Sequence, residues 1–137
     1  MTPEQKLLVQ DSFAKIAPYA NDIATLFYGR LFMLDPAVRE LFHGDMVEQR
    51  RKLMQTIGIA VKGLDRLELL IPTLQELGRR HVSYGVKDED YDTVGTALLW
   101  SLEQFLGADF TPEAKEAWAT VYGILANTMK GTVAAAA

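Results

Sequence analysis

Residues 111–129 read TPEAKEAWATVYGILANTM, a stretch with the start, the period and the length of one long helix. Thr111 is a polar cap, and the proline after it suits the first helical position, where no backbone N–H is needed. Large apolar residues then recur every three or four positions, at Trp118, Val121, Leu125 and Met129. This spacing places them on one face, so the segment predicts a helix with one buried stripe.

The same helical period runs through the rest of the chain. Three further stripes have this spacing: Ala24, Tyr28, Leu31 and Phe32; Leu74, Leu77 and His81; and Val94, Leu98, Leu102 and Phe105. Polar caps followed by proline begin segments at Thr2 and Asp35, and glycines follow apolar segments at Gly63, Gly85 and Gly107. Sustained alternation bounded by hairpin turns, which is typical of strands, is missing from the sequence. We therefore predict an all-α fold of about six to eight helices joined by short connections.

The size of the chain bounds its architecture. Its 137 residues suit a single domain, which we assign to residues 1–133. Residues 134–137 are all alanine, and we interpret them as a frayed end or an expression remnant.

Composition and charge exclude several function classes. The sequence has no cysteine, which rules out disulfides, thiolate catalysis and zinc or iron–sulfur sites held by cysteine. Its 14 basic and 18 acidic residues give a net charge of −4, which argues against nucleic acid as a partner. No apolar stretch approaches the roughly 18 residues that a membrane span needs, and the N-terminus lacks a signal-peptide core. We therefore expect a cytoplasmic protein without a membrane span.

The sequence contains two histidines, and they differ in setting. His43 lies in a predicted loop, where we expect a solvated side chain. His81 lies near the end of a predicted helix, on the apolar stripe of Leu74 and Leu77, and we expect Gly78 to leave space beside it. Spacing alone leaves two interpretations of His81, which are a metal ligand and a core histidine with a satisfied hydrogen bond.

Four segments together resemble the bacterial single-domain haemoglobins and the haem domain of flavohaemoglobins. These segments are LFYGRLF (26–32), DPAVRELF (35–42), LGRRHVSYGV (77–86) and YDTVG (91–95). The final helix, with Trp118 and Tyr122, also fits the pattern, so the resemblance covers roughly residues 4 to 130. It implies a globin fold around a pocket for haem b, iron protoporphyrin IX.

The resemblance assigns roles to residues on both sides of that haem. His81 matches the proximal ligand of the iron, and Phe42 matches the aromatic residue that packs against the porphyrin face. Tyr28 and Gln49 match the distal positions, where an O–H and an N–H would stabilise bound oxygen through hydrogen bonds. Without the resemblance, Tyr28 would be interpreted as a core tyrosine and Gln49 as an exposed helix residue.

Further residues are expected to complete the pocket. Leu53, Val94 and Leu98 would close it with apolar bulk. Lys52 and Arg80 are the basic residues expected to meet the haem propionates, and solvation is the alternative for both. Tyr91 matches a tyrosine that polarises the proximal histidine in flavohaemoglobins, together with a glutamate. The position of that glutamate falls at about Val133, so the resemblance implies weaker polarisation here.

Three hypotheses for function follow. We favour a protein that reversibly binds dioxygen, for carriage, storage or buffering, and that also binds NO and CO, rather than an enzyme. The second is a haem enzyme, a nitric oxide dioxygenase or peroxidase, which would need a reductase in trans because we expect no flavin domain in this chain. The third is a globin-fold interaction module, haem-free or sensory.

Overall fold

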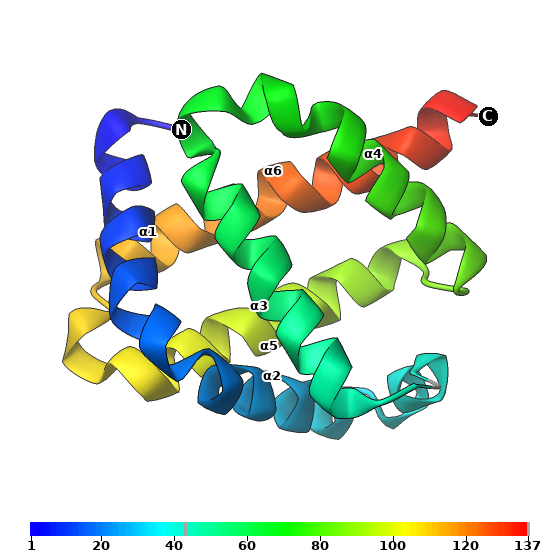
Figure 1. Ribbon diagram of the computed structural model, residues 1–137, viewed down its shortest axis with the longest axis horizontal. Coiled ribbons are helices and arrows are strands. Elements are labelled where there is room, and N and C mark those ends of the chain that lie inside the picture. The colour runs from blue at the N-terminus through cyan, green and yellow to red at the C-terminus, as the bar shows by residue number, and fades with distance from the viewer. Residues whose placement is uncertain (43, 137) are drawn as a thin grey trace.

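A computed structural model of the chain describes residues 1–42 and 44–136, with residues 132–136 described for the backbone alone. Over these residues the chain forms six α-helices joined by short loops and four 3₁₀ helices (Figure 1). The α-helices are α1 (Pro3–Ile16), α2 (Ala20–Leu34), α3 (Met46–Lys62), α4 (Leu67–Ser83), α5 (Asp88–Leu106) and α6 (Pro112–Ala136). The 3₁₀ helices are η1 (Ala17–Tyr19), η2 (Pro36–Leu41), η3 (Leu64–Arg66) and η4 (Gly107–Asp109). The prediction of an all-α fold is confirmed.

Several helix ends follow the predicted capping residues. Thr2 forms a capping box at the start of α1, and the Thr111 hydroxyl accepts a hydrogen bond from the Ala114 N–H at the start of α6. Gly85 and Gly107 both have positive φ, at 90° and 55°, which explains why glycine follows α4 and α5. Asp35 caps a segment as expected, but that segment is the short 3₁₀ helix η2 rather than an α-helix.

The helices cross one another around one main core (Figure 1). The closest pairs are α4 with α6, α2 with α5, and α1 with α6. Fully buried side chains fill the space between them: Val9, Ile16, Ile23, Leu31, Leu64 and Leu102. In contrast, α3 and α4 make little direct contact, because α3 packs on α2 and α1 while α4 packs on α6.

The contact between α4 and α6 depends on Gly78. A Cβ atom at this position would overlap the backbone carbonyl of Met129, so only glycine lets the two helices approach this closely. The expectation that Gly78 leaves space beside His81 was therefore wrong, because the backbone of α6 occupies that space. The helical backbone of α6 continues through Ala136, and the domain boundary after residue 133 stays a prediction.

Candidate functional site

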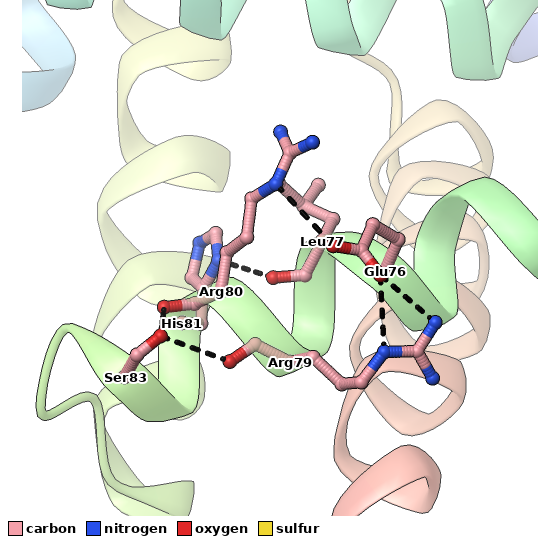
Figure 2. A network of polar contacts seen from close by, with 6 residues as sticks. All are labelled: Glu76, Leu77, Arg79, Arg80, His81 and Ser83. Carbon is pink, nitrogen blue, oxygen red and sulfur yellow. Dashed lines mark hydrogen bonds and ion pairs between the residues drawn. The ribbon is translucent and has the colours of Figure 1, made fainter.

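His81 presents one nitrogen for coordination. Its Nδ1 atom lies 2.8 Å from the backbone oxygen of Leu77, one turn earlier in α4, and donates a hydrogen bond to it when the proton is on Nδ1 (Figure 2). Burial lowers the pKa of the half-buried His81 imidazole, so the ring is neutral at neutral pH. A neutral ring with Nδ1 engaged has a free lone pair on Nε2, as a metal ligand requires.

A polar network lies on the same turn of α4. Glu76 contacts Arg79 at 2.9 Å and Arg80 at 3.7 Å, and all three side chains are largely exposed (Figure 2). Exposed pairs of this kind contribute little to stability, so Arg80 can exchange Glu76 for another anion at small cost. Lys52, the other basic residue expected near a haem, is exposed on α3.

Tyr91 of α5 stacks against His81. The two ring centroids are 6.3 Å apart with 28° between the ring planes, and Tyr91 is buried. The Tyr122 hydroxyl of α6 donates a hydrogen bond to the Tyr91 backbone oxygen at 2.6 Å. Gly95 makes room for the Tyr122 side chain, because a Cβ atom at position 95 would lie 2.7 Å from the Tyr122 ring. Tyr91 therefore touches His81 through its ring face, while Nδ1 of His81 is directed to Leu77.

Tyr28 and Gln49 meet across two helices. The side-chain amide of Gln49 in α3 donates a hydrogen bond to the Tyr28 hydroxyl oxygen in α2, with 3.1 Å between Nε2 and Oη. Burial raises the pKa of the Tyr28 phenol, although the Gln49 hydrogen bond acts in the opposite direction. Tyr28 is therefore protonated at neutral pH, and because its oxygen is the acceptor in this bond, its own hydrogen is available for a third group.

Aromatic rings surround the Tyr28 side chain. Phe42 lies edge to face with Tyr28 at 5.4 Å between centroids, and Phe27 does so at 4.8 Å. Phe32 joins the group, at 5.8 Å from Tyr28 and 5.5 Å from Phe42. Edge-to-face pairs at these distances are favourable, so the rings fix both the phenol and the Phe42 side chain that follows η2.

The apolar residues of the candidate site divide into two clusters. Tyr28 and Leu98 belong to the main core, with Phe42, Leu53 and Val94 packed on its edge. Tyr91 belongs to a second, smaller cluster with Leu74, Ala126 and Met129, and Leu77 packs against it. The structure therefore brings the expected distal residues together in one cluster and places the surroundings of His81 in the other.

A cleft of about 480 Å³ lies between α3 and α4. Thr56, Ile59 and Ala60 line it from α3, while Leu77 and Arg80 are among its residues on α4. This volume is within the usual range of cofactor sites, and the lining is mostly apolar. The cleft reaches the turn that carries His81, but Tyr28 and Gln49 are not part of its wall.

The donor side chains near His81 suit a metal ion that is already coordinated by most of its other ligands. Among the residues that the structure describes, no three His, Cys, Asp or Glu side chains lie close enough to hold an ion. A single neutral imidazole beside an apolar cleft fits a macrocycle such as haem, which leaves only axial positions for the protein. In the same part of the chain, no helix has the length and apolarity to cross a membrane.

Two residues singled out in the sequence cannot be compared with the structure, and two contacts in the structure were not predicted. His43 lies outside the described residues, and so does the side chain of Val133. Sequence reasoning did not identify the Leu77 carbonyl as the partner of His81, although the four-residue spacing on one helix gives that signal. It also missed the contact of Tyr122 with Tyr91, which joins two helices and has no signal in sequence spacing.

Comparisons with known proteins agree with the all-α fold. The sequence profile of the family described as Globin matches residues 25–129. A flavohemoprotein from Bordetella parapertussis is 31% identical over 134 residues, which cover 96% of this chain and 33% of that protein. The chain thus spans about a third of the length of this relative. Neuroglobin from Danio rerio is 32% identical, over 94% of this chain and 90% of its own. A solved bacterial globin from Campylobacter jejuni superposes with a TM-score of 0.84 at 27% identity, and covers 96% of this chain and 95% of its own.

Proposed function

Since the chain belongs to the globin family, we propose that it binds haem b through His81 and binds dioxygen reversibly on the opposite side. Membership in the family supports haem-based binding of a diatomic gas, and dioxygen is our proposal for that gas. The observation that carries it is the hydrogen bond from Gln49 to Tyr28, which leaves the Tyr28 hydrogen free for a bound ligand.

His81 supplies the bond between protein and cofactor in this proposal. Haem, when bound through His81, would supply an iron able to bind a diatomic gas. The Leu77 carbonyl holds the imidazole in one orientation, and burial keeps it neutral. Both effects prepare Nε2 for coordination before the cofactor arrives.

The apolar residues exclude water from the site. Phe42 is held by Tyr28 and Phe32 and would pack against the macrocycle, while Leu53, Val94 and Leu98 belong to or pack against the same core cluster. Lys52 and Arg80 are exposed at the edges of α3 and α4 and would bind the propionates. Exclusion of water strengthens every hydrogen bond made inside the pocket.

Tyr28 and Gln49 would retain the oxygen. Bound dioxygen carries partial negative charge, and a hydrogen bond to a charged group is worth roughly 1.5–3 kcal/mol. Tyr28 is then the direct donor, and Gln49 orients it by donating to the phenolic oxygen. Oxygen would dissociate about 10- to 150-fold faster without this donor.

A second candidate is a haem enzyme that converts nitric oxide to nitrate or acts as a peroxidase. The similarity to a flavohemoprotein over 96% of the chain favours it. Conversion of nitric oxide and dioxygen to nitrate consumes one electron for each nitric oxide, so sustained turnover would require a reductase as partner, and peroxidase activity would likewise need a reductant. Both candidates are consistent with a cytoplasmic location, which we also propose.

Spectra of the purified protein loaded with haem would test these candidates. The ferrous protein should give one spectrum under argon, a second under oxygen, and the first again after oxygen is removed. Irreversible oxidation on the first exposure to oxygen would contradict reversible binding. Sustained nitric oxide consumption with NADH and an added flavin reductase, at rates far above oxygen release, would favour the enzyme instead.

A further inference from the structure

We propose that Lys130 is a positioning residue that acts through Tyr91 on His81 and biases a bound haem toward the ferrous state. The inference rests on the proposed function, since it requires that His81 be the iron ligand. It concerns Lys130, a residue to which neither the family resemblance nor the gas-binding role assigns a part.

Three side chains from three helices form a row on this side of the molecule. The His81 ring of α4 stacks on the Tyr91 ring of α5, with 6.3 Å between their centroids. The Lys130 ammonium of α6 lies 5.4 Å from the centroid of the same Tyr91 ring. An ammonium at this distance from an aromatic face is attracted by the ring quadrupole, so the charge is held next to Tyr91.

The position of Lys130 is fixed by the contacts that α6 makes with α4 and α5. The backbone of the preceding residue, Met129, abuts Gly78 of α4, where any Cβ atom would overlap it. Two turns earlier, the Tyr122 hydroxyl bonds to the Tyr91 backbone oxygen at 2.6 Å. Because α6 is anchored to α5 at Tyr122 and to α4 at Met129, directly before Lys130, the ammonium is held near Tyr91.

Among the residues whose side chains the structure describes, Lys130 forms no ion pair with a carboxylate. Within the described residues, the lysines that pair with carboxylates are Lys6, Lys15 and Lys115, whereas the contact of Lys130 is the Tyr91 ring. Asp88, in the first turn of α5, is the acidic residue whose charge reaches Tyr91. Asp88 is exposed and Lys130 is half-buried, so solvent screens the carboxylate more strongly than the ammonium.

The charge of Lys130 therefore disfavours further positive charge on a haem iron bound to His81. Oxidation of ferrous haem to ferric haem removes one electron and adds one positive charge, which a nearby cation opposes. In addition, Nδ1 of His81 bonds to the neutral Leu77 carbonyl oxygen. This bond makes the imidazole less electron-rich than a hydrogen bond to a carboxylate would. Both features stabilise the reduced iron, the form that binds dioxygen.

The test is a spectroelectrochemical titration of the haem-loaded protein with dye mediators. In Lys130→Gln, the ratio of ferrous to ferric protein at a fixed potential should fall about three- to tenfold, and a tenfold change corresponds to about 59 mV for one electron. Lys130→Met also removes the charge but keeps the apolar stem of the side chain, and it should lower the ferrous-to-ferric ratio to the same extent. This second variant tests the inference even if Lys130→Gln disturbs folding. Lys130→Arg keeps the charge and should restore the ratio of the wild type.

Lys115→Gln is the matched control, because it removes the same charge from the same helix at an exposed position. It should change the ratio less than about twofold. The inference is overturned if Lys130→Gln and Lys130→Met both keep the wild-type ratio, or if Lys115→Gln lowers it equally. The proposed function fails separately if the wild type binds no haem, or if His81→Ala has the same haem spectrum as the wild type.

Discussion

The Gln49 side chain donates a hydrogen bond to the Tyr28 hydroxyl, with 3.1 Å between Nε2 and Oη, and so links α3 to α2. In this bond the phenol is the acceptor, which leaves its hydrogen available to a third group. The burial of Tyr28 ensures that this hydrogen is present at neutral pH. Tyr28 is thus a buried hydrogen-bond donor that a second residue holds in place.

Replacement of Gln49 by leucine tests this orienting role. Gln49→Leu removes the donor and keeps an apolar side chain of similar size, so Tyr28 loses its partner but keeps its hydroxyl. Oxygen should dissociate about 3- to 10-fold faster, a smaller change than removal of the Tyr28 hydroxyl itself. Flash photolysis or stopped flow would measure it. If Gln49→Leu increased the oxygen dissociation rate more than Tyr28→Phe does, Gln49 rather than Tyr28 would be the direct donor.

Replacement of His81 by alanine tests the ligand assignment. The variant loses the imidazole nitrogen that we propose as the iron ligand, so haem should be lost or bound weakly, with a reduced and shifted Soret band. His43→Ala is the control and should keep the wild-type spectrum. Retention of a wild-type spectrum by His81→Ala would show that another group binds the iron.

The stability of the haem-free protein should depend on pH through His81. Burial lowers the pKa of the folded His81 below its ordinary value of 6.5. The unfolded state therefore binds a proton first as the pH falls below about 6.5, and the free energy of unfolding decreases until the lowered pKa of the folded protein is reached. Urea titrations at several pH values should show this loss in the wild type and a smaller one in His81→Gln. Parallel curves for the two proteins would contradict it.

Gly78→Ala should destabilise the protein. The added methyl group overlaps the Met129 backbone, which cannot move as a flexible side chain could, so we expect a loss of about 1–3 kcal/mol. Gly29→Ala is the control, since a Cβ at that helical position meets no atom within 4 Å. It should be neutral or stabilising by up to about 1 kcal/mol. Equal melting temperatures for the two variants would disprove the close packing of α4 on α6.

The features that the sequence predicted correctly are local ones. Helical period, the Thr2 and Thr111 caps and the glycines after α4 and α5 depend on neighbours within a few residues. Asp35 shows the limit of such predictions. It caps a segment as expected, but that segment, η2, is a 3₁₀ helix. A short segment between two packed helices takes the winding that the packing allows.

Contacts between helices could not be predicted in the same way. Gly78 was expected to leave space, yet it meets the backbone of α6, since nothing in α4 alone shows where α6 crosses it. The stacking of Tyr91 on His81 and the place of Lys130 depend on the same crossing. The pairing of Tyr28 with Gln49 agrees with the family resemblance, which carries information on packing that spacing lacks.

The most direct test of the account compares oxygen with carbon monoxide in Tyr28→Phe. The substitution keeps the ring among Phe27, Phe32 and Phe42 and removes only the hydroxyl. Bound carbon monoxide carries little charge and gains little from a donor, so stopped-flow dissociation should be about 10- to 150-fold faster for oxygen and only slightly changed for carbon monoxide. Equal, small changes for the two gases would contradict the claim that Tyr28 retains oxygen through a hydrogen bond.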